Sequence, residues 1–323
     1  MRRIARVKRS DRFPVSTHLL RRIALASLIA NIVIVVTGAA VRLTGSGLGC
    51  PTWPRCTDDS YTATPAMGIN GAIEFGNRLL TFAVAAAALA GLVAALLHRP
   101  RRRSVVLLAG GVLAGIPAQA VIGGITVLTN LNPWVVGLHF LASMGVIAVA
   151  YAFWRRVDEP DTPAIPAVPS PIRALAGLTV VASAAVIVVG VIVTGSGPHA
   201  GDADAKRNGL DPATISQVHA DLVFLLLGLS VALWLALKAV GPASAARAAG
   251  VLVVVELAQG MIGFVQYFTG LPVIAVGAHM LGACLVWVAT LAALWSTRTR
   301  RPRTDDAATA SARAADQGLV HAP

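Results

Sequence analysis

Charged residues are scarce in this chain of 323 residues, and their scarcity excludes a water-soluble globular domain. Asp, Glu, Lys and Arg make up 13% of the residues and apolar types 56%, whereas soluble domains average about 25% charged residues. The apolar residues fall in blocks of roughly 20, the length that a hydrocarbon layer of ~30 Å requires of a helix. Backbone groups in lipid must bond within the chain, so these blocks predict transmembrane helices.

Eight such blocks predict an all-α, polytopic membrane protein. The predicted spans are residues 22–41, 73–97, 105–127, 133–154, 173–195, 214–237, 248–268 and 273–295. With both termini on one side, 22 of the 27 Lys and Arg residues fall on that side. The excess of basic residues in cytoplasmic segments then places both termini in the cytoplasm of a cell-membrane protein. The net charge of +12 therefore indicates membrane orientation rather than a nucleic-acid partner.

The segments outside the spans divide the chain. No clear small-residue cleavage site follows the basic segment 1–21, so we expect a cytoplasmic N-terminus and an uncleaved first span. Segment 158–172 holds five prolines and predicts a stiff cytoplasmic linker between a first half, 22–157, and a second half, 173–296. The polar, Ala-rich tail 297–323 is expected to be disordered.

The two halves repeat each other. QAVIGGITVLTNLNPWVVGLHFLAS, from Gln119, aligns without a gap with QGMIGFVQYFTGLPVIAVGAHMLGA, from Gln259, and TGSG occurs at both Thr44 and Thr194. Each half has four spans, an even number, so both insert with the same orientation. The sequence therefore predicts two tandem four-helix bundles related by a pseudo-two-fold axis along the membrane normal, with bundle cores suited to cofactors.

Three histidines lie inside predicted spans: His139, His219 and His279. Each lies about 10 Å below the outer end of its helix, and Asn77 takes the corresponding place in the second span. An ionisable residue in a membrane faces the bundle interior and is a functional candidate; a hydrogen bond to a neighbouring helix is the alternative. The other histidines fall outside the spans: His18, His98 and His321 in cytoplasmic segments, where solvated surface is expected, and His199 in an outer loop, where its role is open.

No cluster of thiolates or carboxylates accompanies these histidines, which disfavours zinc, because zinc takes about four ligands. His219 and His279 can instead ligate a haem iron axially from two sides. The first half offers His139 and Asn77, and asparagine is a poor iron ligand. Two strong ligands suit electron transfer, whereas an open position suits chemistry. We therefore expect an electron-carrying haem in the second half and the reactive site in the first.

The first outer loop contains the motif CPTWPRC, in which Cys50 and Cys56 flank two prolines. The loop faces the oxidising side, where a disulfide can persist. A structural disulfide and a redox-active or haem-handling pair both remain open. Cys284 lies within the last span and is expected to be a small apolar core residue.

Charged residues near the outer ends of the spans are further candidates. Glu74 precedes Asn77 by three residues, so both lie on one face of the second helix. Glu74 either caps that helix or transfers protons beside the reactive site. Arg42 and Arg78 either pair with haem propionates or extend to the membrane interface.

Several motifs together resemble the haem A synthase family, membrane enzymes that convert haem O to haem A. They are TGAAVRLTGSGLGCPTWPRC, EFGNR, GGITVLTNLNPWVVGLHF, the second TGSG, QVHAD and GAHMLGA, and the resemblance covers residues 20–296. It implies haem b held by His219 and His279, and substrate haem O in the first half near Glu74, Asn77, Arg78 and His139. Asn77 departs from the family's Glu-x-x-His-Arg motif, and the cysteine pair is shared by a subset of the family, here expected to be an actinobacterial-type member.

The resemblance also implies a reaction and partners. The expected enzyme is an oxidoreductase that acts on a CH or CH₂ group and converts a ring methyl (C8) of haem O to a formyl group by successive hydroxylations. It implies a prenyltransferase, haem O synthase, as haem donor, an electron donor of unknown identity, and terminal oxidase assembly factors. Two other classes stay open. A diheme electron-transfer cytochrome normally needs four axial ligands, and a repeat-built transporter normally has interrupted spans.

Overall fold

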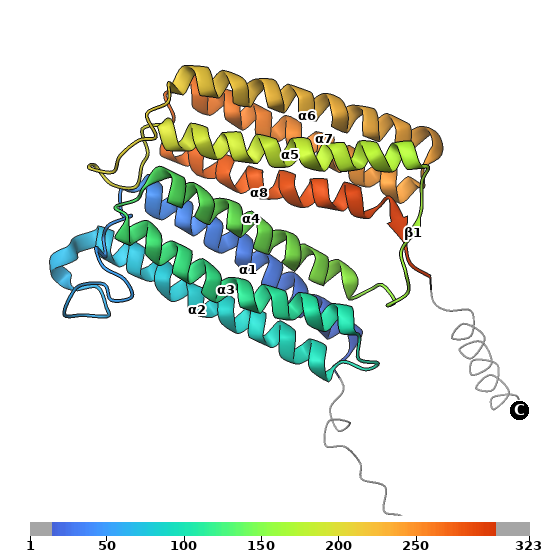
Figure 1. Ribbon diagram of the computed structural model, residues 1–323, viewed down its shortest axis with the longest axis horizontal. Coiled ribbons are helices and arrows are strands. Elements are labelled where there is room, and N and C mark those ends of the chain that lie inside the picture. Colours follow the sequence, from blue (N-terminus) through green and yellow to red (C-terminus); the bar gives the residue numbers. More distant parts are fainter. Residues whose placement is uncertain (1–14, 302–323) are drawn as a thin grey trace, which may run out of the picture.

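The computed structural model describes residues 15–301, and long helices that run side by side dominate it (Figure 1). The helices are α1 (Thr17–Leu43), α2 (Gly68–Leu97), α3 (Arg103–Leu128), α4 (Pro133–Arg156), α5 (Ser170–Ser196), α6 (Pro212–Val240), α7 (Ala243–Phe268) and α8 (Val273–Trp295). All eight are long and apolar enough to cross a membrane. The eight predicted spans are thus confirmed, and most helices extend a few residues beyond them.

The helices begin and end where local chemistry favours it. Ser16 caps α1 by accepting a hydrogen bond from the backbone N–H of Leu19 at 3.2 Å, which moves the start of α1 five residues ahead of the predicted span. The turns α3–α4 and α7–α8 repeat the same unusual backbone: Leu131 and its repeat partner Leu271 both have positive φ, 57° and 61°. Bulky residues rarely adopt this conformation, so its recurrence supports the duplication.

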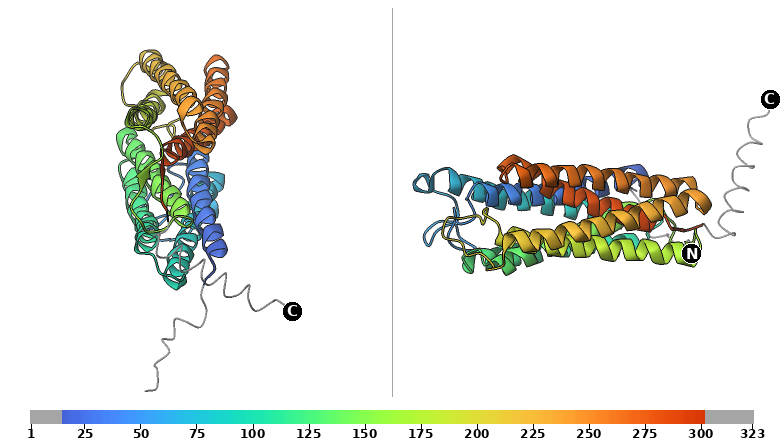
Figure 2. Two further views of the ribbon diagram at one scale, coloured as in Figure 1. Left: turned by 90° about the vertical axis from the view of Figure 1, so that its right-hand side faces the viewer. Right: turned by 90° about the horizontal axis from the view of Figure 1, so that it is seen from above.

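Packing between helices forms two closed bundles. In the first, α1 contacts α2, α2 contacts α3, α3 contacts α4 and α4 contacts α1; the second repeats the pattern with α5 to α8. Between the bundles α1 packs on α8, α4 on α5, and α4 on α8. Exchanging α1–α4 with α5–α8 maps these contacts onto one another, as a pseudo-two-fold axis requires. The end view in Figure 2 shows the two groups of helices beside each other.

We call the end of the molecule at which α1 ends the loop end, and the opposite end the linker end. Each bundle has its buried apolar core toward the linker end. In α6 the buried residues begin at Leu226, and in α7 they stop at Glu256. Within these two helices, the loop-end half contains no fully buried residue. The interior positions of that half are therefore less tightly filled than the rest of the bundle.

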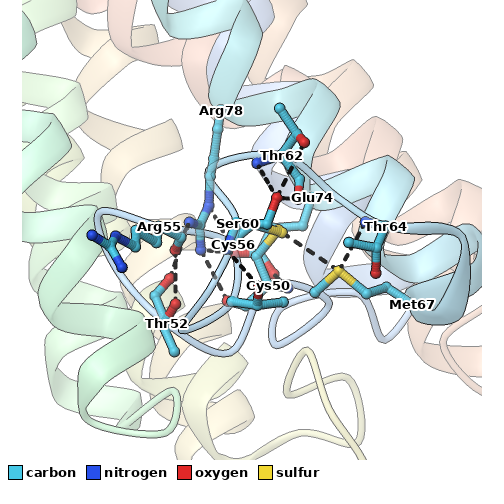
Figure 3. Close-up of a disulfide and its surroundings, with 11 residues drawn as sticks. Cys50, Thr52, Arg55, Cys56, Ser60, Thr62, Thr64, Met67, Glu74 and Arg78 are labelled. Atoms are coloured by element: carbon cyan, nitrogen blue, oxygen red, sulfur yellow. Dashed lines mark hydrogen bonds and ion pairs between the residues drawn. A yellow bond between two sulfur atoms is a disulfide. The ribbon is translucent and has the colours of Figure 1, made fainter.

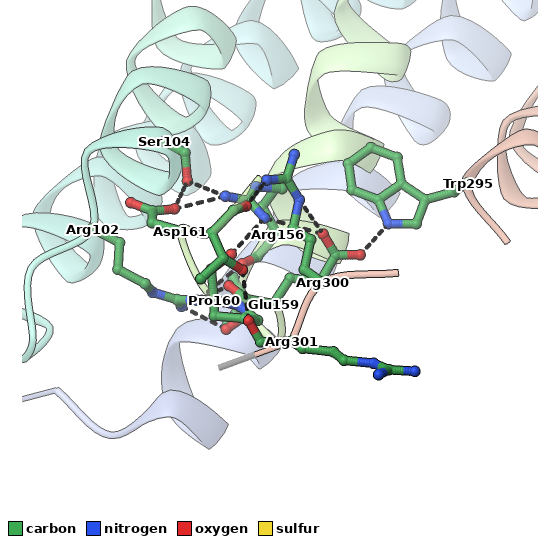
Figure 4. Close-up of polar contacts among 11 residues, drawn as sticks. Arg102, Ser104, Arg156, Glu159, Pro160, Asp161, Trp295, Arg300 and Arg301 are labelled. Carbon is green, nitrogen blue, oxygen red and sulfur yellow. Dashed lines mark hydrogen bonds and ion pairs between the residues drawn. The ribbon is translucent and has the colours of Figure 1, made fainter. Parts of the chain in front are cut away.

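The linker is fixed at the linker end by a network of polar contacts around Arg156 (Figure 4). Arg156 is only 5% exposed and pairs with Glu159 at 3.1 Å and Asp161 at 2.6 Å. Ser104 of α3 donates to Asp161, and Arg300 pairs with Glu159 at 3.3 Å. The Pro-rich segment is thereby tied to α3, α4 and the chain after α8.

Two expectations differ from the structure at this end. Disorder was expected from residue 297 onward, whereas β2 (Arg298–Thr299) pairs antiparallel with β1 (Ile165–Pro166); residues 302–323 lie outside the described part. His98 was expected on solvated surface, but it is 5% exposed and its Nδ1 lies 3.0 Å from the carbonyl oxygen of Val15. His18 is exposed as expected, and His321 is outside the described residues.

Candidate functional site

The three intramembrane histidines occupy the loop-end halves of the bundles, and each ring lies against a glycine of a neighbouring helix. A Cβ atom at Gly123 or Gly263 would lie 3.3 Å from Cε1 of His139 or His279. At Gly190 it would lie 3.0 Å from Cε1 of His219. A side chain at any of these glycines would therefore crowd the imidazole. Gly123 and Gly263 are repeat partners, so the arrangement is common to both bundles.

His219 and His279 face each other across the second bundle. Their ring centroids are 6.5 Å apart and the ring planes are inclined by 67°. A metal–imidazole nitrogen bond is about 2.0–2.1 Å long, and each nitrogen lies about 1.1 Å from its ring centre, so two imidazoles on opposite sides of one metal ion have centroids about 6.3 Å apart. The observed separation matches that value within a few tenths of an ångström.

Hydrogen bonding gives a second test of whether these rings suit a metal. The Nδ1 atoms of His139, His219 and His279 are buried and make no hydrogen bond, although buried polar atoms in folded proteins nearly always have a partner. In residues 15–301, no group of three or more His, Cys, Asp or Glu side chains could hold a metal ion together. Two imidazoles without a third protein ligand fit haem iron, whose other four ligands come from the macrocycle.

The first bundle offers a different set. Asn77 takes the place that His219 has in the second bundle, and its Oδ1 accepts a hydrogen bond of 2.8 Å from the hydroxyl of Thr37. A Cβ atom at Gly38 would lie 4.0 Å from Nδ2 of Asn77, so the asparagine also faces a glycine. His139 makes no ring contact with another histidine among the described residues. A haem in this bundle would have one strong protein ligand.

The cysteine loop is anchored to α2 by Glu74 and Arg78 (Figure 3). Cys50 and Cys56 form a disulfide, and both are 0% exposed. The backbone N–H of Cys50 donates to Oε2 of Glu74 at 2.7 Å. Arg78 donates to Oε1 of Glu74 at 2.5 Å and to the carbonyl oxygens of Cys50, Thr52 and Arg55 at 3.0 to 3.1 Å.

These contacts decide between some of the alternative roles that the sequence left open for the cysteine pair, Glu74 and Arg78. The disulfide is confirmed, and the burial of both cysteines favours a structural role, since a redox-active pair must be accessible. The reading of Glu74 as a helix cap is wrong, because α2 begins six residues earlier at Gly68. All five N–H groups of Arg78 point at protein oxygens. Cys284 is 0% exposed and belongs to the apolar core, as predicted.

Arg42 connects the two halves at the loop end. Its Nε donates to the carbonyl oxygen of His199 at 2.6 Å and its Nη2 to that of Thr194 at 2.8 Å. Nε2 of His199 lies 2.9 Å from the carbonyl oxygen of Leu271 in the α7–α8 turn. The role of His199, open from the sequence, is thus to fix its loop. No signal in the sequence pointed to these contacts, because they join segments distant along the chain.

The sequence also missed a buried polar pair in the second bundle. Ser230 of α6 donates to Oε1 of Glu256 of α7 at 2.8 Å, and both side chains are buried. A charged residue type near the middle of a span was a detectable signal. A surface cavity of about 480 Å³ lies elsewhere: residues such as Leu48, Met67 and Asp202 line it, and the histidines do not.

Fold and site together define a class: a multi-pass membrane protein of two four-helix bundles with a facing pair of imidazoles inside one of them. The particular family follows from comparison with known proteins. The profile of the family described as cytochrome oxidase assembly protein (COX15-CtaA) matches residues 21–202, more than half of the chain, and the chain belongs to this family.

Two curated relatives are similar over shorter stretches. The Heme A synthase of Geobacillus kaustophilus (strain HTA426) is 32% identical over 115 residues, 34% of this chain and 34% of the relative. The Heme A synthase of Lysinibacillus sphaericus (strain C3-41) is 32% identical over 145 residues, 44% of this chain and 46% of the relative. The matched part thus spans less than half of either relative. The predicted resemblance to the haem A synthase family is confirmed, while the actinobacterial sub-type stays a prediction.

Proposed function

We propose that this protein is a haem A synthase, an oxidoreductase that converts the C8 methyl of haem O to a formyl group. Two successive hydroxylations of that methyl give a geminal diol, which loses water to leave the aldehyde. The observation that carries the proposal is the separation of 6.5 Å between the His219 and His279 rings, together with their unpartnered Nδ1 atoms. Membership of the family and the names of both relatives agree with it.

The second bundle is proposed to hold haem b between His219 and His279. The group would supply one-electron transfer to the reactive site. The protein's task there is to keep two imidazoles at a fixed separation, and Gly190 and Gly263 give each ring its place. Gln259 adds rigidity, since its Nε2 donates to the carbonyl oxygen of His279 at 2.9 Å.

The first bundle is proposed to bind the substrate haem O through His139. Asn77 is held by Thr37 at 2.8 Å and leaves the opposite side of the substrate without a strong ligand, which suits a reactive site. Glu74 lies one turn from Asn77 on α2 and is 6% exposed. We assign it two tasks: it anchors the cysteine loop over the site, and it accepts and returns protons as the methyl is hydroxylated.

Of the two arginines, Arg42 is the better candidate for a haem propionate. Its Nε and Nη2 bond to carbonyl oxygens, and no described residue accepts a hydrogen bond from its Nη1. Arg78 uses all five N–H groups on Glu74 and the loop. A propionate at Arg78 would have to displace one of these bonds, whereas Arg42 can bind one in addition to its present partners.

The distribution of basic residues supports a cell-membrane location with both termini in the cytoplasm and the loop end outside. Haem O synthase is the proposed haem donor, because its prenylated product is the substrate. A separate electron donor and terminal oxidase assembly factors complete the proposed partners.

The test is mass analysis of haem extracted from the protein after co-expression with a haem O source. Wild type should yield haem A or its hydroxylated precursor together with protohaem. Glu74→Gln should yield haem O and protohaem without haem A, whereas Asp59→Asn, an exposed carboxylate in the same loop, should behave like wild type. A normal haem A yield from Glu74→Gln would remove Glu74 from the mechanism. Protohaem alone from wild type would instead support a diheme electron-transfer cytochrome.

A further inference from the structure

Glu256 is a buried carboxyl group that the proposed reaction does not use. It lies 13 residues from the start and 12 from the end of α7, which places it near the middle of the membrane. Its side chain is 7% exposed. Oε1 accepts the hydrogen bond from Ser230 at 2.8 Å, and Oε2 is buried without any partner. An ionised carboxylate in this setting is costly, so the neutral acid is the favoured form.

The first bundle has no counterpart of this pair. The repeat places Ile116 at the position of Glu256, and the register that pairs Asn77 with His219 places Ala88 at that of Ser230. Both replacements are buried, at 7% and 2% exposed. An apolar pair therefore suffices to pack these two helices, and the polar pair occurs only in the bundle with two facing histidines.

Polar groups connect Glu256 to the histidine level along one face of α7. Gln259, Gly263 and Gln266 follow it at intervals of three, four and three residues, so all four lie on one face. A Cβ atom at Gly263 would lie 3.3 Å from Cε1 of His279, and Gln259 donates to the His279 carbonyl oxygen. The Oε1 atoms of both glutamines are buried without partners. These side chains form the polar face of α7 between Glu256 and the loop end.

Toward the linker end, the same interior is closed by apolar packing. The residues just below Glu256 that are fully buried are Leu233, Leu237, Ala249 and Leu252, each 0% exposed. The buried polar groups among these helices are hydroxyls with hydrogen-bond partners: Thr290 donates to Ser183 at 3.2 Å, and Thr179 donates to the carbonyl oxygen of Leu175 at 2.9 Å. None of the four apolar residues has a titratable side chain, so the loop end is the side from which we expect protons to reach Glu256.

Few other charges face Glu256 from the helices that pack on α7, which are α6 and α8. On α6, His219 lies toward the loop end, and Lys238 lies toward the linker end with its ammonium 5.0 Å from the Trp234 ring. On α8, His279 is the candidate ligand, while Cys284 packs into the core of the first bundle. Arg247, on α7 itself, is exposed. None of these makes an ion pair with Glu256 within residues 15–301.

We infer that Glu256 is a proton-binding site coupled to electron transfer at the metal centre between His219 and His279. This inference rests on the proposed function, which places haem b there. When the centre gains one electron from a one-electron donor, the carboxyl group of Glu256 binds its proton more tightly, and the fraction of Glu256 that is ionised takes up protons from water at the loop end. When the electron leaves, the same fraction releases its protons by the same route. The charge gained by the apolar interior on reduction is then partly neutralised.

The distance between the two groups sets the expected size of the coupling. Gly263, in contact with His279, is two helical turns or about 10 Å from Glu256 along α7. At that distance, an effective dielectric constant of about 20 corresponds to roughly a tenfold change in proton affinity between the two redox states. A tenfold change corresponds to about 59 mV for one electron. Raising the pH ionises Glu256, and the negative charge favours the oxidised centre, so the midpoint potential should fall.

The experiment is a redox titration of the haem-loaded protein between pH 5 and 9, with redox-difference infrared spectroscopy on the same samples. Wild type should show a total fall of about 59 mV and gain a carbonyl band of a protonated carboxylic acid on reduction. Glu256→Gln keeps the shape and the hydrogen-bonding capacity but cannot titrate, so its potential should not depend on pH and the band should be absent. Glu256→Asp, the matched control, should retain both signals.

The outcomes separate this inference from the proposed function. If Glu256→Gln binds haem normally and keeps the wild-type pH dependence and infrared band, Glu256 only joins α6 to α7 and the inference is overturned. If wild type binds no haem with two histidine ligands, the proposed function fails, and the coupling fails with it.

Discussion

The two bundles share one backbone plan but differ in the polar groups that they enclose. Both place a ring against the repeat-related glycines, Gly123 and Gly263, and both use a positive φ in the turn that precedes the last helix. Only the second bundle pairs two imidazoles, His219 and His279, at 6.5 Å. In the first, Asn77 bonds to Thr37 instead.

This difference shows how duplication separates two tasks. The shared glycines and turns fix where a flat group can lie between helices in either bundle. The side chains at the ligand positions then decide whether that group has two strong ligands or one. The second bundle is suited to hold a permanent electron carrier, and the first is suited to bind a substrate and release a product.

Removing one ligand from the second bundle should have the largest effect. In His279→Ala the remaining imidazole cannot hold a haem with two histidine ligands, so the low-spin absorption bands of that haem should be lost almost completely. His18→Ala, which changes an exposed histidine, is the control. The measurement is the absorption spectrum of purified protein with the haem-to-protein ratio. Unchanged low-spin bands in His279→Ala would refute the assignment of ligands.

Disrupting the loop anchor should affect the first bundle alone. Arg78→Leu leaves the buried Glu74 carboxylate without its cation, and breaking such a pair destabilises by about 3–5 kcal/mol. We expect proteolysis of the cysteine loop to accelerate strongly while the low-spin haem of the second bundle is retained. Arg55→Leu, an exposed arginine of the same loop, serves for comparison. If Arg78→Leu lost the low-spin haem as well as the protease resistance of the loop, the bundles would not be independent.

Removing the disulfide should destabilise the same loop by a smaller amount. Cys50 and Cys56 are six residues apart, and closing so short a loop contributes about 2 kcal/mol through the unfolded chain. The double variant Cys50→Ser with Cys56→Ser should lower the thermal midpoint in detergent but keep the low-spin haem. If haem A formation stopped at temperatures where the double variant is still folded, the pair would have a redox role.

A histidine in place of Asn77 would give the first bundle the same pair of ligands as the second. Asn77→His loses the Thr37 hydrogen bond, which costs about 1 kcal/mol, and offers a second imidazole opposite His139. Haem bound in the first bundle should then become low-spin, and turnover should fall because the open position is filled. The number of low-spin haems per chain measures this, and Asn77→Ser is the control. If Asn77→His leaves the count at one, Asn77 does not face the substrate.

The smallest effect concerns the polar network at the linker end. Burial alone would raise the pKa of Asp161, but hydrogen bonds from Ser104 and the charges of Arg156 and Arg102 lower it below its ordinary 3.8. A lowered pKa stabilises the fold above pH 3.8, and this contribution is lost as the pH falls through the lowered value. Because the Asp161 side chain is 34% exposed, we expect under about 1 kcal/mol. Comparing wild type with Asp161→Asn in thermal unfolding from pH 6 to 3 tests it: the difference should shrink as the pH falls below 3.8.

Features with a periodic or repeated signal could be predicted from the sequence. The eight helices follow from blocks of apolar residues, the two bundles from the repeat, and His139, His219 and His279 from their equal depth. The disulfide was one of two readings of the cysteine pair. Each of these depends on residues close in sequence or on a pattern that recurs.

Contacts between distant segments could not be predicted in this way. Arg78 binds carbonyl oxygens of the cysteine loop, Arg42 binds the loop after α5, and His98 packs against Val15. Backbone carbonyl groups are the same in every residue, so the sequence does not reveal which of them an arginine will meet. Glu256 was visible as an acidic residue in an apolar block, but its partner Ser230 was not.

Stepwise loading of haem-free protein tests the contrast between the bundles most directly. One equivalent of protohaem and then one of haem O are added, and electron paramagnetic resonance records the spin state of each. We predict that protohaem gives one low-spin signal per chain, typical of two histidine ligands, and that haem O then adds one high-spin signal. Two low-spin signals, or a first equivalent that stays high-spin, would contradict it.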